Sequence, residues 1–207
     1  DPMLLIDEFS ADAIRYFLLR EITLGQDGNF NRDALITRIN ADLANDLGNL
    51  LHRTLNMIGK FQQGILIESV GETELDKSLK DMAIDTAKNY RELMDDMKIS
   101  DAVKTVWQFI SRTNKYIDET APWKLAKDSE QKQNLANVLY NLAESLRIIS
   151  TLISPYMPNT SRRIHEQLKI NQPFENIRLE DAEIFGLLEK NHEVGKPEQL
   201  FPRIEVK

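Results

Sequence analysis

Apolar and polar residues alternate with the period of an α-helix through residues 33–60. With 3.6 residues per turn, the apolar side chains of this stretch fall within one arc of roughly 160°. The residues on this arc are Ile36, Ile39, Leu43, Ala44, Leu47, Leu50, Leu51, Leu55 and Ile58. The pattern predicts a long amphipathic helix with a single broad apolar face, which the rest of the chain covers.

The opposite face of this helix is polar and unusual in its composition. It carries Asn45, Asn49, His52, Arg53 and Asn56. Asparagine is a poor helix former because its short amide competes for backbone hydrogen bonds, so a merely solvated face would more readily carry Glu, Lys or Gln. Two interpretations remain open: a solvated face, or a row of donors and acceptors that contacts another molecule.

Further helices are predicted on both sides of residues 33–60. Apolar residues recur with helical spacing in 10–20, 72–97, 100–117, 134–153 and 160–168. The predicted N-caps are Ser10, Asn31, Ser100 and Thr120. A cap at Thr120 would place Pro122 in a first helical turn, where proline is tolerated. Trp107 lies on the apolar side of its helix and is expected in the core.

Loops and a long tail separate or follow these helices. Two glycines and the Asp27-Gly28 pair predict a loop at 25–31, and residues 61–69 are expected to form an irregular turn. Regular periodicity is lost over 171–207, which should pack back on the helices as loop and extended chain. The predicted fold is therefore all-α: an antiparallel helix bundle with an irregular C-terminal tail.

Composition limits the kinds of function that are compatible with this fold. With 207 residues, 42% of them hydrophobic, the chain can bury a substantial core. It contains no cysteine, which excludes disulfides and thiolate chemistry and suits a reducing cytoplasm. No apolar run approaches the ~20 residues that cross a bilayer, so no membrane association is expected. The net charge of −7 argues against broad phosphate binding, so a nucleic-acid site would have to recognise bases locally.

The sequence offers no active-site motif. His52, His165 and His192 are widely separated, and no phosphate-binding loop or nucleophile motif is present. Asp42 and Asp46 are expected to be ordinary surface acids that would repel stray phosphates. No catalytic residue and no metal site are predicted.

Four segments together resemble the C-terminal part of the methionyl-tRNA synthetases, a class I family. They are ADAIRYFLLREITLGQDGNF (11–30), RINADLANDLGNLLHR (38–53), YIDETAPWKLAKD (116–128) and LFPRIE (200–205). They occur in the family's order and spacing. The resemblance covers nearly the whole chain and implies the class I type of anticodon-binding bundle, with an entry segment at 1–30, the bundle at 31–170 and a tail at 171–207.

The resemblance also implies specific binding residues. Asn49 and Arg53 fall on the family's base-contacting pair, and Asn45 lies one turn earlier on a supporting position. Pro122 and Trp123 match a Pro-Trp whose indole packs against the first anticodon base, a cytosine, and Asp118 matches a neighbouring acid. An alternative role for Trp123 is a structural contact between its helix and the bundle, and the alternative for Arg53 is a surface salt bridge to Asp46 or Asn56.

For function, the resemblance implies recognition of the CAU anticodon of initiator and elongator methionine tRNAs in the cytoplasm, without DNA as a partner. The chain opens at Asp1 and resembles the interior of a longer protein, whose catalytic domain would be a further partner. ATP binding, methionine activation and any zinc site would belong to that missing part, so this fragment alone should need no cofactor and catalyse nothing. The alternatives are the helical domain of a valyl, isoleucyl, leucyl or cysteinyl synthetase, and a helical protein-interaction module.

Overall fold

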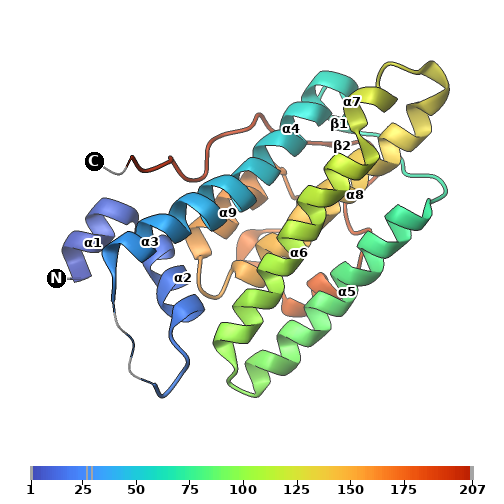
Figure 1. The fold of residues 1–207 in the computed structure, drawn as a ribbon. Coiled ribbons are helices and arrows are strands. Elements are labelled where there is room, and N and C mark those ends of the chain that lie inside the picture. Colours follow the sequence, from blue (N-terminus) through green and yellow to red (C-terminus); the bar gives the residue numbers. More distant parts are fainter. Residues whose placement is uncertain (1, 27, 29, 206–207) are drawn as a thin grey trace.

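The computed structural model describes residues 2–26, 28 and 30–205. Its helices are α1 (Pro2–Phe9), α2 (Ala11–Glu21), α3 (Arg32–Arg38), α4 (Asn49–Gln62), α5 (Glu74–Asp95), α6 (Ile99–Thr120), α7 (Pro122–Leu125), α8 (Lys132–Ile153) and α9 (Pro158–Gln167). A π-helix, η1 (Ile39–Gly48), joins α3 to α4, and short 3₁₀ turns are η2 (Ser129–Gln131), η3 (Phe174–Asn176) and η4 (Leu179–Glu183). The bundle confirms the predicted all-α fold (Figure 1).

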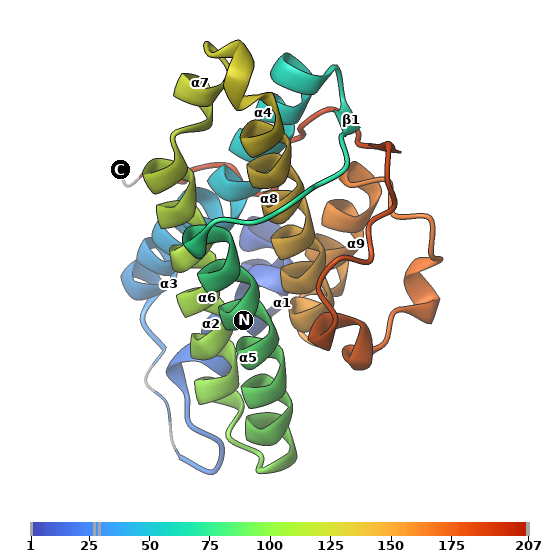
Figure 2. The ribbon, with the colours of Figure 1, turned by 90° about the vertical axis from the view of Figure 1, so that its right-hand side faces the viewer.

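Helix α8 lies at the centre of the bundle. Nearly its whole length is buried, with α5, α6 and α9 packed around it and α4 alongside (Figure 2). Helices α5 and α6, of 22 residues each, pack against each other and are joined by the turn at residues 96–98. The other helices thus shield α8 from solvent, together with polar side chains such as those of Asn141, Glu144 and Arg147 that it carries into the interior.

The helix predicted at 33–60 is present, but its centre is wider than an α-helix. Residues Ile39–Gly48 form the π-helix η1, whose hydrogen bonds span five residues instead of four. Gly48 fits this turn because a Cβ there would lie only 3.0 Å from the Leu43 carbonyl oxygen. The predicted apolar face is buried throughout, except that Ala44 is half-buried. The π segment was not predicted, and such segments often occur at functional sites.

Two of the four predicted N-caps are correct. The Ser10 side chain accepts from the Ala13 N–H, and the Asn31 side chain accepts from the N–H groups of the next helix. Ser100 instead lies inside α6, where its hydroxyl donates to the Arg20 carbonyl at 2.9 Å. Thr120 is the last residue of α6, and its hydroxyl donates to the Tyr116 carbonyl at 2.7 Å. Serine and threonine also bond to backbone carbonyls, an alternative that sequence position cannot exclude.

Trp107 lies in the core, as predicted. Its contacts also explain why the prediction that Asp42 is a surface acid is wrong. The indole is 5% exposed, packs on Tyr16 at a centroid distance of 4.2 Å, and donates to the Asp42 carbonyl. Asp42 is itself buried, with its carboxylate accepting from the Tyr16 hydroxyl at 2.6 Å and from Arg38. Asp42 is therefore not a surface acid, because α2 and α6 cover it. Burial first, and then Asp42, raise the pKa of Tyr16.

The C-terminal tail packs back along the bundle and is held by a buried ion pair. The Glu144 and Arg147 side chains of α8 are 2.8 Å apart and almost fully buried. Arg147 donates to the carbonyls of Asp181 and Ile184, and Glu144 accepts from the N–H groups at 186 and 188. Strand β2 (His192–Glu193) then pairs antiparallel with β1 (Ile65–Leu66), which lies within the predicted irregular turn.

The predicted loop at 25–31 connects α2 and α3, and Gly25 adopts a left-handed φ of 82° there. Asp27 of the predicted Asp27-Gly28 pair lies outside the described residues. The two last residues of the predicted tail, 206 and 207, also lie outside them.

Candidate nucleic-acid interface

The polar side chains of the long helix divide between two flanks. Asn45, Asn49 and His52 are exposed and face the C-terminal tail, together with which they line a groove. Arg53 is half-buried and turns toward α6. Because His52 and Arg53 follow Asn49 by three and four residues on the same helix, Asn49 lies beside both and thus between these two flanks.

On the α6 flank, Arg53 forms an ion pair with Asp118, whose carboxylate lies 2.9 Å from the guanidinium. The salt-bridge partner of Arg53 is therefore neither Asp46 nor Asn56. The Asp118 side chain is 66% exposed and that of Arg53 is 31% exposed. Solvent screening makes exposed ion pairs weak, so Arg53 can exchange Asp118 for another acceptor at little cost. The pair places two predicted site residues, 65 positions apart, in contact.

The Pro-Trp segment follows α6 directly. Ala121 adopts a left-handed φ of 44°, which ends α6 and starts α7 in a new direction. Pro122 is buried at the first position of α7, where its missing N–H leaves no hydrogen bond unmade. Trp123, the next residue, is 41% exposed, in contrast to the core residue Trp107. An indole left this accessible offers a flat apolar face to solvent.

Asp46 belongs to η1, beside α6, and is only half-buried. Asn114 of α6 donates to the Asp46 carbonyl at 3.1 Å, which holds η1 against α6 one turn of α6 before Asp118. Burial, and then the neighbouring Asp42, raise the pKa of the Asp46 carboxyl group. Of the two acids predicted on the surface, only Asp46 is therefore partly accessible to a ligand.

The groove on the tail flank has a volume of about 670 Å³. Asn45, Asn49 and His52 form one wall, and Phe201 and Arg203 of the tail form the other. This volume lies within the range of small-ligand sites. The sequence alone gave no sign of this wall, because nothing in the pattern of 171–207 indicates which helix face the tail covers.

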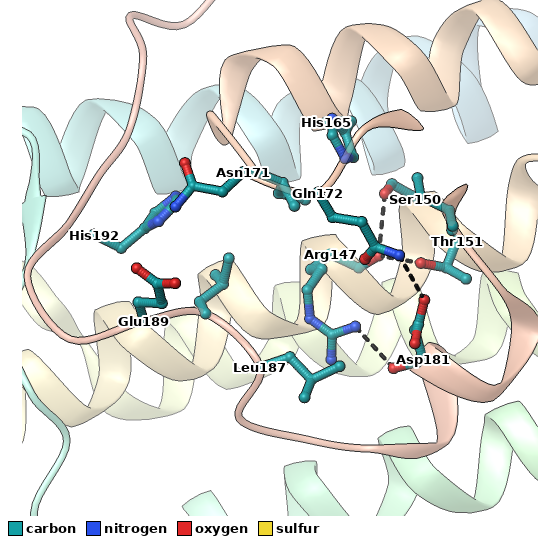
Figure 3. A pocket seen from close by; sticks show the side chains of 13 residues that line it. Arg147, Ser150, Thr151, His165, Asn171, Gln172, Asp181, Leu187, Glu189 and His192 are labelled. Atoms are coloured by element: carbon teal, nitrogen blue, oxygen red, sulfur yellow. Dashed lines mark hydrogen bonds between the residues drawn. The ribbon is translucent and has the colours of Figure 1, made fainter. Parts of the chain in front are cut away.

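A second cavity, of about 170 Å³, lies between α8, α9 and the tail (Figure 3). Its polar side chains bond to groups of the surrounding fold: Gln172 donates to the Asp181 side chain, and Ser150 and Thr151 donate to the Arg147 backbone carbonyl. The cavity is smaller than typical ligand sites, and its hydrogen bonds hold the tail in place. It is therefore part of the fold and not the candidate site.

His165 lines this second cavity and is expected to make stability depend on pH. The imidazole is 6% exposed and its Nε2 has no hydrogen-bond partner among the described residues. Burial lowers the pKa of His165 below its ordinary 6.5. At a pH between the lowered pKa of folded His165 and the ordinary pKa of 6.5 in the unfolded chain, the unfolded chain binds more protons than the folded chain. Acidification through about pH 6.5 should therefore reduce the free energy of unfolding.

Urea titrations at about pH 7.5 and 5.5 would measure this loss in the wild type and in His165→Gln. The variant should lose less stability than the wild type on acidification. The same loss in both would mean that other groups cause it.

No metal centre or membrane-spanning element is found in the part of the chain that the structure describes. No three His, Asp or Glu side chains within it are placed to hold a metal ion. None of its helices combines the length and apolar character that crossing a membrane requires.

Comparisons with known proteins identify the family of this chain. The family described as the anticodon binding domain of methionyl tRNA ligase matches residues 68–207, and the class I (M) tRNA synthetase family matches residues 1–55. The methionine–tRNA ligase of Caldanaerobacter subterraneus is 50% identical over this whole chain, which covers 32% of that relative. The Bacillus subtilis ligase is 48% identical over 99% of the chain, covering 31% of the relative.

Solved structures give the same match. Apo methionyl-tRNA synthetase from Mycobacterium tuberculosis superimposes on the whole chain with a TM-score of 0.92 and 31% identity, and the chain covers 41% of that structure. The chain thus spans about a third of the length of the curated relatives it matches.

Proposed function

This chain belongs to the methionyl-tRNA ligase family and carries its anticodon-binding domain, and we propose that it recognises the CAU anticodon of methionine tRNAs by base stacking and hydrogen bonding. The recognition residues are Asn49, Arg53 and Trp123, with Asn45, Asp118 and Pro122 in support. One observation carries this proposal: Trp123 is exposed at the start of α7, close in sequence to Asp118, which is paired with Arg53.

Stacking on Trp123 would supply part of the affinity. The anticodon bases of a folded tRNA can be unstacked, which exposes their faces and their Watson–Crick edges. A base that stacks on an aromatic ring gains about 1–3 kcal/mol. Buried Pro122 and left-handed Ala121 fix the start of α7, so the Trp123 indole is positioned before the base arrives. Such preorganisation reduces the entropy lost on binding.

Stacking tolerates any base, so discrimination would come from the polar side chains. The Arg53 guanidinium donates to carbonyl oxygens and ring nitrogens, and the Asn49 amide both donates and accepts. A wrong base would leave these groups without partners, which costs more than the correct contacts gain. Asp118 holds the guanidinium in a defined orientation until a base edge replaces the carboxylate.

The activity of a whole ligase is part of this proposal, because the chain spans only a third of its relatives. Initiator and elongator methionine tRNAs, present in the cytoplasm, would be the substrates, and the catalytic domain would bind alongside this bundle. ATP would be used there, and any zinc would be bound there. The bundle would contribute selection of the tRNA and no step of aminoacylation.

Titration of the 207-residue chain with anticodon stem-loops tests the proposal. We expect the CAU loop to bind more tightly than loops with a changed first base. Equal affinity for all loops would contradict base recognition. Preference for the anticodon of valine, isoleucine, leucine or cysteine would assign the bundle to another class I enzyme, and absence of RNA binding would favour a protein-interaction module.

Arg53→Ala is expected to weaken CAU binding by about five- to 150-fold and to reduce the difference between CAU and changed loops, because a two-point contact to a base edge provides about 1–3 kcal/mol of discrimination. Fluorescence anisotropy with the CAU loop and a changed loop measures both effects. Arg53→Lys, the matched control, keeps the charge but loses the planar fork, so it should lose discrimination as well. A uniform loss across all loops would instead indicate a phosphate contact.

A further inference from the structure

The groove between the long helix and the tail differs in charge from the rest of this acidic chain. The chain has 33 Asp and Glu residues and a net charge of −7. None of the described residues that line the groove is an acid; instead they include Arg203, the His52 imidazole, and the amides of Asn45 and Asn49. A groove free of carboxylates, with one guanidinium and several amide donors, suits an anion that also carries hydrogen-bonding edges.

The tail holds Arg203 in a fixed position over this groove. Asn40 exchanges two hydrogen bonds with the Ile204 backbone, accepting from its N–H at 2.8 Å and donating to its carbonyl at 2.9 Å. The Arg163 guanidinium donates to the carbonyls at 199 and 200. Phe201 is only 7% exposed and anchors the segment between them. The backbone that carries Arg203 is therefore fixed on both sides.

The Arg203 side chain itself remains available. It is exposed, and no hydrogen bond or ion pair joins its guanidinium to another residue in 2–26, 28 or 30–205. By comparison, Arg147 and Arg163 bond to tail carbonyls, and Arg53 is paired with Asp118. A cation with a fixed backbone and a free head group can bind an anion without first losing an internal partner.

The groove adjoins the proposed anticodon site. Asn45, Asn49 and His52 follow one another at about helical spacing over roughly 10 Å of the helix. Asn49 contributes to the groove and, in the proposed function, to recognition of a base on the other flank. A ligand in this groove would therefore lie directly beside the recognised base.

We propose that this groove binds the nucleotide that adjoins the recognised base in the same tRNA loop, with its phosphate on Arg203 and its base edge on the amide of Asn45. His52 lies against the sugar and phosphate. This inference rests on the proposed function. The Arg203 contact adds affinity without adding base preference, because every nucleotide carries the same phosphate.

Arg203→Gln tests the proposal in the 207-residue chain. We expect an affinity loss of about tenfold that is equal for CAU and changed loops, since a hydrogen bond to a charged group is removed. The slope of log K against log salt should fall by about 0.7, the value for one phosphate in single-stranded RNA. His52→Gln should show a smaller uniform loss. Lys88→Gln removes one exposed charge on α5, outside the groove, and should bind like the wild type.

Ethylating single phosphates of the stem-loop locates the contact. One ethylated phosphate next to the anticodon should weaken binding to the wild type but make no difference to Arg203→Gln. If Arg203→Gln has wild-type affinity, salt slope and interference, or changes base preference instead of uniform affinity, the groove does not hold a phosphate. Its occupant would then be sought among protein segments.

The two proposals can fail separately. A wild-type chain that does not prefer CAU would remove the proposed function, and this inference with it. If the wild type prefers CAU and this preference depends on Trp123, while Arg203→Gln has no effect, only the proposal for the groove is contradicted.

Discussion

Trp123→Ala is expected to lower the affinity for a CAU stem-loop by about five- to 150-fold, corresponding to the roughly 1–3 kcal/mol of one base–aromatic stack. The same change should leave the free energy of unfolding within about 1 kcal/mol of the wild type. The reason is the position of the indole: with 41% of its surface exposed, it contributes a face to solvent and only part of its area to the fold.

The second tryptophan of the chain provides the matched control. Trp107 is 5% exposed and donates to the Asp42 carbonyl. Trp107→Ala should therefore reduce the free energy of unfolding by about 3–5 kcal/mol. Anisotropy titration and urea unfolding on both variants separate binding from folding. If Trp123→Ala destabilises the chain as much as Trp107→Ala, or binds CAU as well as the wild type, the indole has a structural role.

Glu144→Ala is expected to reduce the free energy of unfolding by about 3–5 kcal/mol, the cost of breaking a buried ion pair by removing one partner. Arg147 would be left as an uncompensated charge at 5% exposure, and two tail N–H groups would lose their acceptor. Urea unfolding measures the loss. Hydrogen exchange should become faster at the amides of 186 and 188 before the helices unfold.

A surface ion pair is the control for this variant. Glu175 pairs with Arg162 in solvent, so Glu175→Ala should change stability little. Glu144→Leu combined with Arg147→Met should recover much of the loss, because no charge is then left buried. Failure of the double variant to recover would mean that Glu144 acts mainly through its bonds to the tail backbone.

The helices and their apolar faces could be predicted from the sequence, since burial of one side imposes a period of 3.6 residues. Eight of the nine apolar positions predicted from Ile36 to Ile58 are buried and Ala44 is half-buried, and Ser10 and Asn31 cap their helices. A cap depends on a hydrogen bond two or three residues away, so the necessary information is local. The family could also be identified, because four segments carry its residues in order.

Single side chains on the polar face were harder to predict. The exposure of Asn45 and Asn49 follows from the helix itself. Their roles as site residues, with those of Arg53 and Trp123, rest on the family resemblance and stay proposals. Asp42 lies on the same helix, yet Tyr16 and Trp107 cover it. The periodicity of one helix could not predict this, because the covering side chains belong to other helices.

The sequence alone thus determined the all-α bundle, the core face of its long helix and the family, because these depend on periodicity, local hydrogen bonds and residue order. Only the tertiary structure determined that Arg53 pairs with Asp118, that Glu144 and Arg147 hold the tail, and that Arg203 completes a groove beside Asn49. Each of these involves a contact between elements distant in sequence. Such contacts depend on which helix faces pack together, and no local pattern of residues encodes that choice.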